Sequence, residues 1–156
     1  MKTSNGIKKN KGFVILFAVM LSSIILAITI GVLNISYKEI KFSTSAKDTN
    51  DAFFAADVGA ECALFYDKST EDKFSLVGSA TTIKCANVSI TPTFVSGVYN
   101  FNVVSLGSEN QSCAIVTVDK TNVLTKIISK GYNDGGGAGS CTQGENTVER
   151  QLELTY

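Results

Sequence analysis

The feature of this sequence that most limits its possible folds is a long apolar run near the N-terminus. From Phe13 to Tyr37 the chain has 25 residues without a charged side chain. With a rise of about 1.5 Å per residue, a helix of this length would span roughly 37 Å, enough to cross a hydrocarbon core about 30 Å thick. A conventional secretory signal has an apolar region of only about 7–15 residues. The run therefore predicts a membrane-spanning helix over residues 13–37.

The charges on either side of this run predict its orientation. Four lysines and no acidic residue precede Gly12: Lys2, Lys8, Lys9 and Lys11. Because the flank richer in lysine and arginine stays in the cytoplasm, we expect a cytoplasmic N-terminus and a single pass through the inner membrane. Residues 38–156 would then form an extracytoplasmic domain.

The helical pattern continues past the apolar run. Between Ser36 and Tyr66 there is no proline and only one glycine, Gly59. Apolar side chains recur there at spacings of mostly three, four or seven, as on one face of a helix: Ile35, Phe42, Ala46, Phe53, Ala56, Ala60 and Leu64. The sequence therefore predicts one helix from Phe13 to Tyr66, about 54 residues long, with residues 38–66 packed on the rest of the domain.

The remainder of the chain has the pattern of a small antiparallel sheet. Six segments rich in Val, Ile, Thr and Tyr are expected to be strands: 81–85, 87–91, 98–106, 113–120, 125–132 and 147–156. A hairpin is expected around residues 121–124, and Pro92 and the glycine-rich residues 131–146 are expected to lie in connections. The predicted fold class is α+β, with the helix laid across a four- or five-stranded antiparallel sheet over residues 74–156.

Composition argues against several functions. The sequence contains no histidine, the commonest general base and metal ligand, and we find no catalytic constellation, so neither an enzyme nor a cofactor is expected. Without the four N-terminal lysines the net charge is about −4 (10 − 14), which disfavours direct nucleic-acid binding. The glycine-rich segment lacks the regular acidic spacing of a calcium loop. The aromatic residues Phe53, Phe54, Phe65 and Tyr66 are expected to fill the helix–sheet core rather than bind a small molecule.

A lysine-rich leader ending in glycine, followed by phenylalanine and an apolar helix, resembles the class III signal of type IV pilins. The resemblance implies that residues 1–12 are a leader, which a prepilin peptidase removes between Gly12 and Phe13, with methylation of the new N-terminus. Most pilins carry glutamate at the fifth mature position, where this chain has Phe17. In lacking this glutamate, the chain resembles minor subunits of the PilX type or the general-secretion K type.

A second stretch, "DAFFAADVGAECALFY" from Asp51 to Tyr66, resembles the segment that follows the membrane helix in PilX-type N-terminal domains. The matching residues are Ala52, Phe53, Ala55, Ala56, Gly59 and Glu61, with Asp57 at a position where an acid is usual. Small residues at this spacing also let a helix lie close to a sheet, and the two interpretations are compatible.

Four cysteines in an exported domain indicate two disulfides, with three possible connectivities. We favour Cys62–Cys85, which would tie the end of the helix to the first strands, and Cys113–Cys141, which would fix the glycine-rich loop to the sheet. The second pair also resembles the disulfide-bounded region of many pilins. A zinc site is the alternative, disfavoured because no two cysteines have the C-x2-C spacing.

Together these patterns lead to one functional hypothesis and one alternative. The resemblance implies a minor pilin or pseudopilin, a structural subunit of a type IV pilus or related filament that ends up in the extracellular pilus. Its partners would be other pilin subunits, through the N-terminal helix, together with the prepilin peptidase and, before assembly, the inner membrane. The alternative is a single-span membrane-anchored binding domain that never enters a filament.

Overall fold

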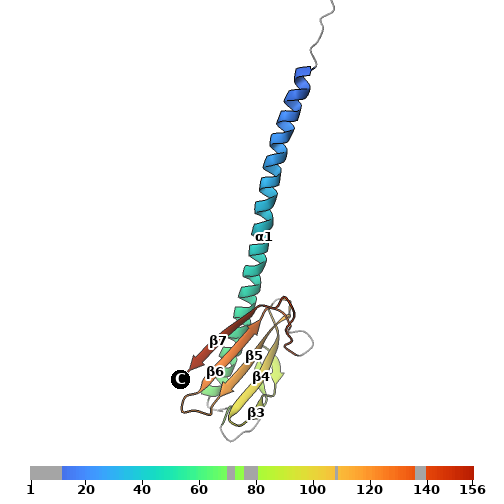
Figure 1. The fold of residues 1–156 in the computed structure, drawn as a ribbon. Helices are drawn as coiled ribbons and strands as arrows, with labels where there is room; N and C mark the ends of the chain where they lie inside the picture. The colour runs from blue at the N-terminus through green and yellow to red at the C-terminus, as the bar shows by residue number, and fades with distance from the viewer. Residues whose placement is uncertain (1–11, 70–72, 76–80, 108, 136–139) are drawn as a thin grey trace, which may run out of the picture. The chain divides into compact units, whose positions relative to one another are not determined.

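The structure is a computed structural model that describes residues 12–69, 73–75, 81–107, 109–135 and 140–156 (Figure 1). The chain divides into two compact units, residues 1–43 and residues 44–156, and each is described by itself. The described residues form one α-helix and seven strands. Their bounds are α1 Gly12–Lys68, β1 Ile83–Cys85, β2 Val88–Ile90, β3 Thr93–Val95, β4 Val98–Leu106, β5 Ser112–Asp119, β6 Lys126–Tyr132 and β7 Glu149–Thr155.

Helix α1 is continuous over 57 residues, so the single long helix predicted from the sequence is confirmed. It begins one residue before the predicted start and ends two residues after the predicted end. No proline interrupts it, and its one glycine between Ser36 and Lys68, Gly59, costs only about 1 kcal/mol of helix propensity. At its C-terminus the amide of Ser69 donates to the carbonyl of Phe65 at 2.9 Å, which completes the last turn.

Strands β3 to β7 form one antiparallel sheet in the order β3-β4-β5-β6-β7. The alternation of apolar and polar residues that predicted β4 to β7 is the alternation between the two faces of this sheet. Strands β5 and β6 form the predicted hairpin, in which Asp119 pairs with Lys126. The α+β class and the antiparallel sheet expected from the sequence are therefore confirmed.

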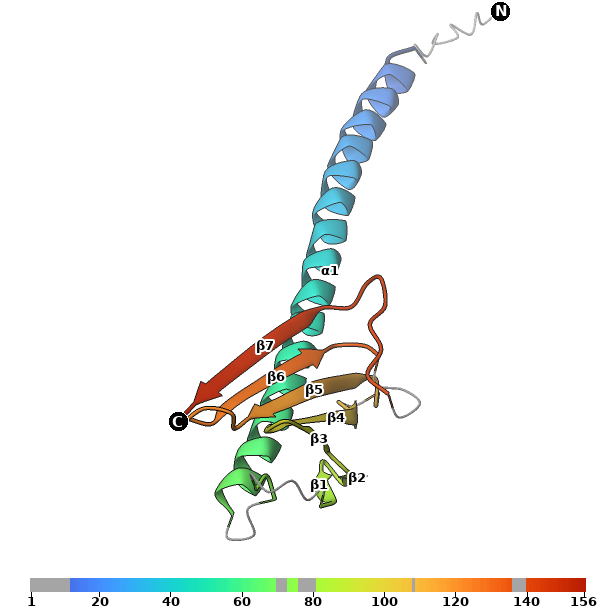
Figure 2. The ribbon, with the colours of Figure 1, turned by 60° about the horizontal axis from the view of Figure 1, so that its bottom comes forward.

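Two details of the sheet differ from expectation. The sequence analysis predicted a single sheet, whereas strands β1 and β2 form a separate two-stranded sheet (Figure 2). Strand β3, directly after Pro92, was expected to be part of a connection, yet it pairs with β4. Both short hairpins turn through residues with positive φ: Ala86 at 47° and Asn87 at 67° in the first, Ser96 at 49° and Gly97 at 87° in the second.

The core of the unit formed by residues 44–156 lies between α1 and one face of the main sheet (Figure 2). The helix contributes small side chains, and the sheet contributes larger ones. The buried helix residues are Ala52, Ala55, Ala56, Ala60 and Ala63, and the buried sheet residues include Tyr99, Phe101, Val103, Val116, Val118 and Ile127. Phe74 is also fully buried and stacks on Phe101 with ring centroids 5.9 Å apart. Because these helix residues are small, the helix backbone lies close to the sheet, and α1 packs on the sheet from Ala52 to Ala63.

Candidate functional site

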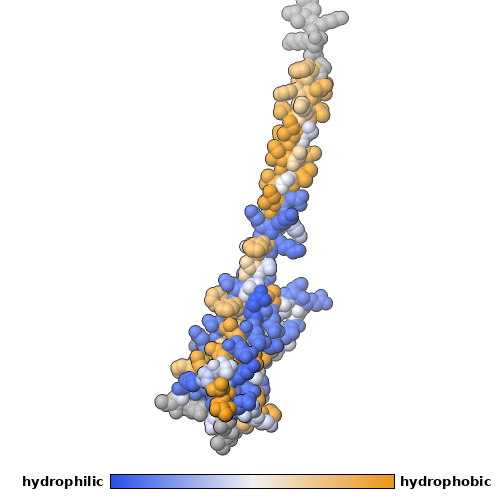
Figure 3. Space-filling view, turned by 60° about the vertical axis from the view of Figure 1, so that its left-hand side comes forward, coloured by the Kyte–Doolittle hydropathy of each residue, from blue (hydrophilic) through white to orange (hydrophobic). Residues whose placement is uncertain are grey.

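The first half of α1 exposes an apolar surface. The exposed fraction of its large apolar side chains is lowest at Leu21, with 45%, and highest at Phe42, with 78%. Figure 3 colours this half of the helix mostly orange, the apolar end of the scale. By length and composition α1 can cross a membrane, and among the described residues it is the one helix that can. An exposed apolar surface of this extent is typical of a region that contacts a membrane or another protein.

The polar side chains within this apolar half bond to their own helix. The hydroxyl of Ser22 donates to the carbonyl of Val19 at 2.9 Å, and that of Ser23 to Met20 at 2.8 Å. Thr29 donates to the carbonyl of Ile25 at 2.8 Å. Because a polar group without a partner is costly in hydrocarbon, these bonds make the hydroxyls compatible with a membrane interior.

The predicted processing site lies at the very start of the helix. Gly12 is the first residue of α1, and the Phe13 side chain is 77% exposed. Phe17, at the position where most pilins have glutamate, is 55% exposed. The rest of the predicted leader, residues 1–11, lies outside the described residues.

The helix segment that resembles PilX-type domains is divided between two faces of α1. Ala52, Ala55, Ala56 and Gly59 are buried against the sheet, whereas Phe53 and Glu61 are exposed. A Cβ added to Gly59 would lie 2.5 Å from the hydroxyl of Ser129 and 2.8 Å from Cγ2 of Val116. The small residues of this segment thus set the distance between helix and sheet.

The expectation that the helix aromatics fill the core is wrong for three of the four. Phe53, Phe54 and Phe65 are 43%, 57% and 66% exposed. The alanine face lies nearest the sheet and leaves no room for rings, so the phenylalanines project away from that contact. Tyr66 is half-buried; its hydroxyl donates to the Lys84 carbonyl at 3.2 Å and accepts from the Lys84 amide at 3.0 Å.

The exposed side of the helix end borders an open, largely apolar groove. Val58, Cys62 and Phe65 line it from the helix, and Lys84 and Cys85 line it from strand β1. Exposed aromatic side chains beside an apolar groove are typical of protein contact surfaces.

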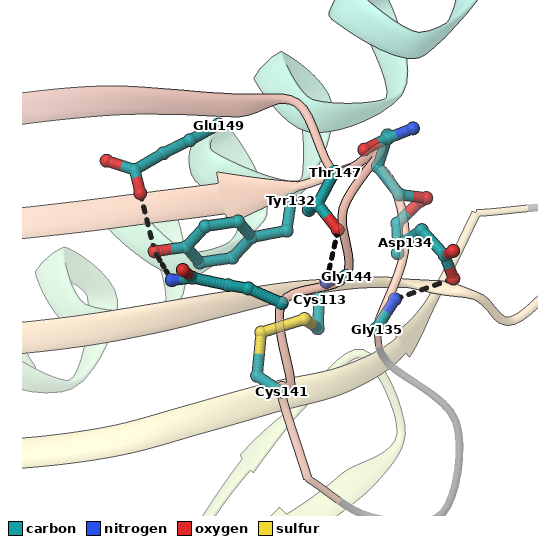
Figure 4. Close-up of a disulfide and its surroundings, with 11 residues drawn as sticks. Cys113, Tyr132, Asp134, Gly135, Cys141, Gly144, Thr147 and Glu149 are labelled. Atoms are coloured by element: carbon teal, nitrogen blue, oxygen red, sulfur yellow. Dashed lines mark hydrogen bonds between the residues drawn. A yellow bond between two sulfur atoms is a disulfide. The ribbon is translucent and has the colours of Figure 1, made fainter.

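Two disulfides hold the domain, and they join the pairs that the sequence analysis favours. Cys62 on α1 is bonded to Cys85 on β1, and Cys113 on β5 is bonded to Cys141. The first attaches the small sheet to the end of the helix. The second attaches the segment between β6 and β7 to the main sheet (Figure 4). With all four cysteines oxidised, no thiolate is available for the alternative zinc site.

A buried tyrosine beneath the second disulfide was not identified from the sequence. The Tyr132 side chain is 2% exposed, and its hydroxyl donates to Glu149 Oε2 at 2.8 Å and accepts from Gln143 Nε2 at 2.9 Å (Figure 4). Burial, reinforced by the Glu149 carboxylate, raises the pKa of Tyr132 to about 12. Tyr132 ends a strand and precedes a glycine-rich segment, and nothing in that local pattern indicates a buried hydrogen-bond centre.

The remaining charged groups of the described residues were compared with the arrangement that a metal site needs. Within the described residues, no group of three or more Cys, Asp or Glu side chains could hold a metal ion. In the glycine-rich segment, Asp134 Oδ1 accepts a hydrogen bond from the amide of Gly135 at 2.7 Å. The Lys47–Glu109 pair, at 3.3 Å, leaves both side chains 61% exposed, and the Glu109 carboxylate raises the pKa of Lys47. Such an exposed pair contributes little to stability.

Comparison of the chain with protein families, with curated proteins and with solved structures finds no match in any of the three.

Proposed function

We propose that this chain is a minor pilin or pseudopilin, a structural subunit of a type IV pilus or a related filament. In this proposal the peptidase cuts between Gly12 and Phe13, the apolar half of α1 holds the subunit in the inner membrane, and the same half then packs among other subunits. The disulfide-bonded head is displayed outside the membrane, and the chain performs no chemistry of its own on a substrate.

The observation that carries the proposal is the continuity of α1. One uninterrupted helix has an exposed apolar first half and a second half packed on an antiparallel sheet through small residues. A simple anchor needs no rigid helix beyond the bilayer, because a flexible linker would serve a tether as well. A filament subunit benefits from a continuous helix, because one half packs among the helices of other subunits and the other half packs on its own head.

The leader and Phe17 support assignment to the minor subgroup. Four lysines precede Gly12, and Gly12 directly precedes Phe13. By the resemblance described above, this is the residue pattern that the prepilin peptidase recognises. Phe17 cannot form the buried charge pair that glutamate makes with a neighbour's N-terminal amine. A subunit without this pair is better suited to a special position, such as the filament tip, than to the repeating shaft.

The rival function is a membrane-anchored binding domain that stays in the bilayer. The exposed Phe54 and Phe65 and the groove beside them would then be its ligand surface. This alternative needs no cut after Gly12, which separates the two proposals.

The deciding experiment is N-terminal sequencing and intact-mass measurement of the protein from membranes, with and without an active prepilin peptidase. We expect a mature N-terminus at Phe13, carrying a methyl group, only when the peptidase is active. An uncut chain that begins at Met1 in the presence of active enzyme would eliminate the pilin pathway and favour the anchored binding domain.

A pair of glycine variants controls for nonspecific effects. Gly12→Val should block the cut, because the peptidase requires a small residue there by the resemblance. Gly31→Ala changes another glycine of α1, where an added Cβ meets nothing within 4 Å, and should be processed normally.

A further inference from the structure

The end of α1 holds a buried charged pair that the proposed function does not use. Asp67 and Lys120 lie on different elements, Asp67 in the last turn of α1 and Lys120 directly after β5. Lys120 Nζ is 2.5 Å from Asp67 Oδ1, and the two side chains are only 14% and 4% exposed, respectively. Two other ion pairs of the main sheet, Lys126–Glu153 and Lys130–Glu149, leave their side chains more than 40% exposed.

The amine of Lys120 is in direct contact with the Asp67 carboxyl group. Lys120 Nζ lies 2.5 Å from Oδ1, which is buried, and this is closer than the usual length of about 2.7–2.9 Å for a charge-assisted N–H···O bond. The two groups therefore occupy neighbouring positions from which a bond between them requires little movement.

The second oxygen of the same carboxyl group is bound by a proton donor. The hydroxyl of Tyr156 donates to Asp67 Oδ2 at 2.6 Å. Burial, and then the Asp67 carboxylate, raise the pKa of Tyr156, so this phenol remains protonated over the ordinary pH range. Lys68 Nζ lies 3.8 Å from the centre of the Tyr156 ring.

From this arrangement we propose that Lys120 and Asp67 form an intramolecular isopeptide bond, with Tyr156 as the proton donor and relay. Little water reaches the pair to solvate its two charges, and transfer of one proton from Lys120 to Asp67 converts it into a neutral amine and a neutral acid. A neutral amine is a nucleophile, and a protonated carboxyl group is an acceptable electrophile. The proposal does not depend on the assignment as a pilin, since it requires only these three residues.

The reaction balances without any other reagent. Lys120 Nζ passes one proton to the Asp67 carboxylate, leaving an amine and a carboxylic acid. The nitrogen lone pair then forms a bond to Cγ of Asp67, and the bond from Cγ to Oδ2 breaks. Oδ2 leaves as water with the first proton and a second one from the nitrogen, relayed by the Tyr156 hydroxyl. The products are one amide and one water molecule, and nothing is oxidised or reduced.

The test is the mass of the purified full-length protein, followed by peptide mapping. We expect the intact mass to be lower than the sequence mass, after allowing for the disulfides and any N-terminal processing, by one water molecule. After reduction, alkylation and trypsin digestion, peptides 48–68 and 85–126 should remain joined, with no cleavage after Lys120. Reduction is essential, because the Cys62–Cys85 disulfide connects the same two peptides.

The peptide map and matched lysine variants separate the amide from a second route to the same loss of mass. Asp134 is followed by Gly135, and such a pair can also lose water by forming a cyclic imide, but that loss does not join two peptides. Lys120→Arg keeps the positive charge, cannot form the amide, and should restore the full mass and separate the peptides. Lys126→Arg, at the exposed pair with Glu153, should change neither result. Tyr156→Phe should lower the joined fraction.

The proposal is overturned if the folded wild-type protein has its full sequence mass, or if the two peptides separate after reduction. It is also overturned if the peptides stay joined in Lys120→Arg. In any of these cases the pair is only a buried salt bridge that fixes the helix end to β5 and the C-terminus.

Discussion

Gly131 of β6 lies against the backbone of Ala56 in α1. A Cβ added to Gly131 would be 2.2 Å from the Ala56 nitrogen and 2.1 Å from the Ala52 carbonyl oxygen, both backbone atoms that cannot rotate away. This close approach of helix and sheet requires a glycine, and it fixes how deeply the alanine face of α1 sits on the sheet. Gly59 on the helix performs the same function opposite Ser129.

We therefore expect Gly131→Ala to destabilise the head by about 3 kcal/mol, at the upper end of the range for overpacked interiors. The measurement is chemical unfolding of the detergent-solubilised protein. Gly144→Ala is the matched control, because its Cβ would meet Thr147 Oγ1 at an ordinary 3.5 Å. Equal stability of the two variants would show that the helix can shift away from the sheet without cost.

The disulfides give a second prediction. Cys62–Cys85 and Cys113–Cys141 close loops of similar size, with sequence separations of 23 and 28 residues. By the chain-entropy model, replacing either pair with alanine should cost about 3 kcal/mol. Unfolding of the two double-alanine variants, each compared with the oxidised wild type, measures both values. A much smaller cost for one pair would mean that its loop is already restricted in the unfolded chain.

Much of this fold follows from patterns that a sequence carries locally. The uncharged run and the absence of proline fix α1 to within two residues at each end, because no competing signal interrupts a helix there. Strands β4 to β7 are long enough for period-two alternation to be visible. Strand β3 has three residues and follows Pro92, so alternation cannot reveal it, and it forms only because the Ser96–Gly97 turn folds it onto β4.

The packing face of α1 could not be predicted in the same way. Alanines and phenylalanines are interspersed between Ala52 and Phe65, and both have helical spacing. Judged by hydrophobicity alone, the phenylalanine rings would be expected in the core. In the structure the alanines face the sheet, because the helix and sheet backbones approach closely at Gly131 and Gly59 and leave no space for rings. The contacts of Tyr132 and Asp67 depend on partners 17 and 89 residues away, respectively, and no local pattern records them.

The β1–β2 hairpin offers a stabilising substitution. Ala86 has φ of 47°, the left-handed region in which a residue with a Cβ is strained by roughly 1–2 kcal/mol. Ala86→Gly should therefore stabilise the head by about 1 kcal/mol, the relief of strain being partly offset by the greater entropy of glycine in the unfolded chain. The measurement is thermal unfolding.

Ser89→Gly on β2 is the control for that substitution. Ser89 is exposed in a strand, so the same change to glycine should be destabilising there. If both variants are destabilised equally, the backbone of the turn is not left-handed in solution.

The buried phenol of Tyr132 predicts how stability depends on alkaline pH. Its pKa is raised from 10.0 to about 12 in the folded protein, so the folded state holds its proton more tightly than the unfolded state. The stabilisation is complete below pH 10 and is lost as the pH rises from 10 to about 12, by up to roughly 2.7 kcal/mol for this group. Tyr156 shifts in the same direction and adds to the loss.

Chemical unfolding at a series of pH values between 9 and about 12 tests this, with tyrosine absorbance recording the ionisation. Tyr132→Phe should be less stable than wild type at pH 9, because Glu149 and Gln143 lose their partner, and its stability should fall less steeply above pH 10. All four cysteines are in disulfides, so the folded protein has no free thiolate to begin exchange at high pH. An unchanged slope in Tyr132→Phe would mean that the phenol reaches water in the folded state and that the segment under the Cys113–Cys141 disulfide opens readily.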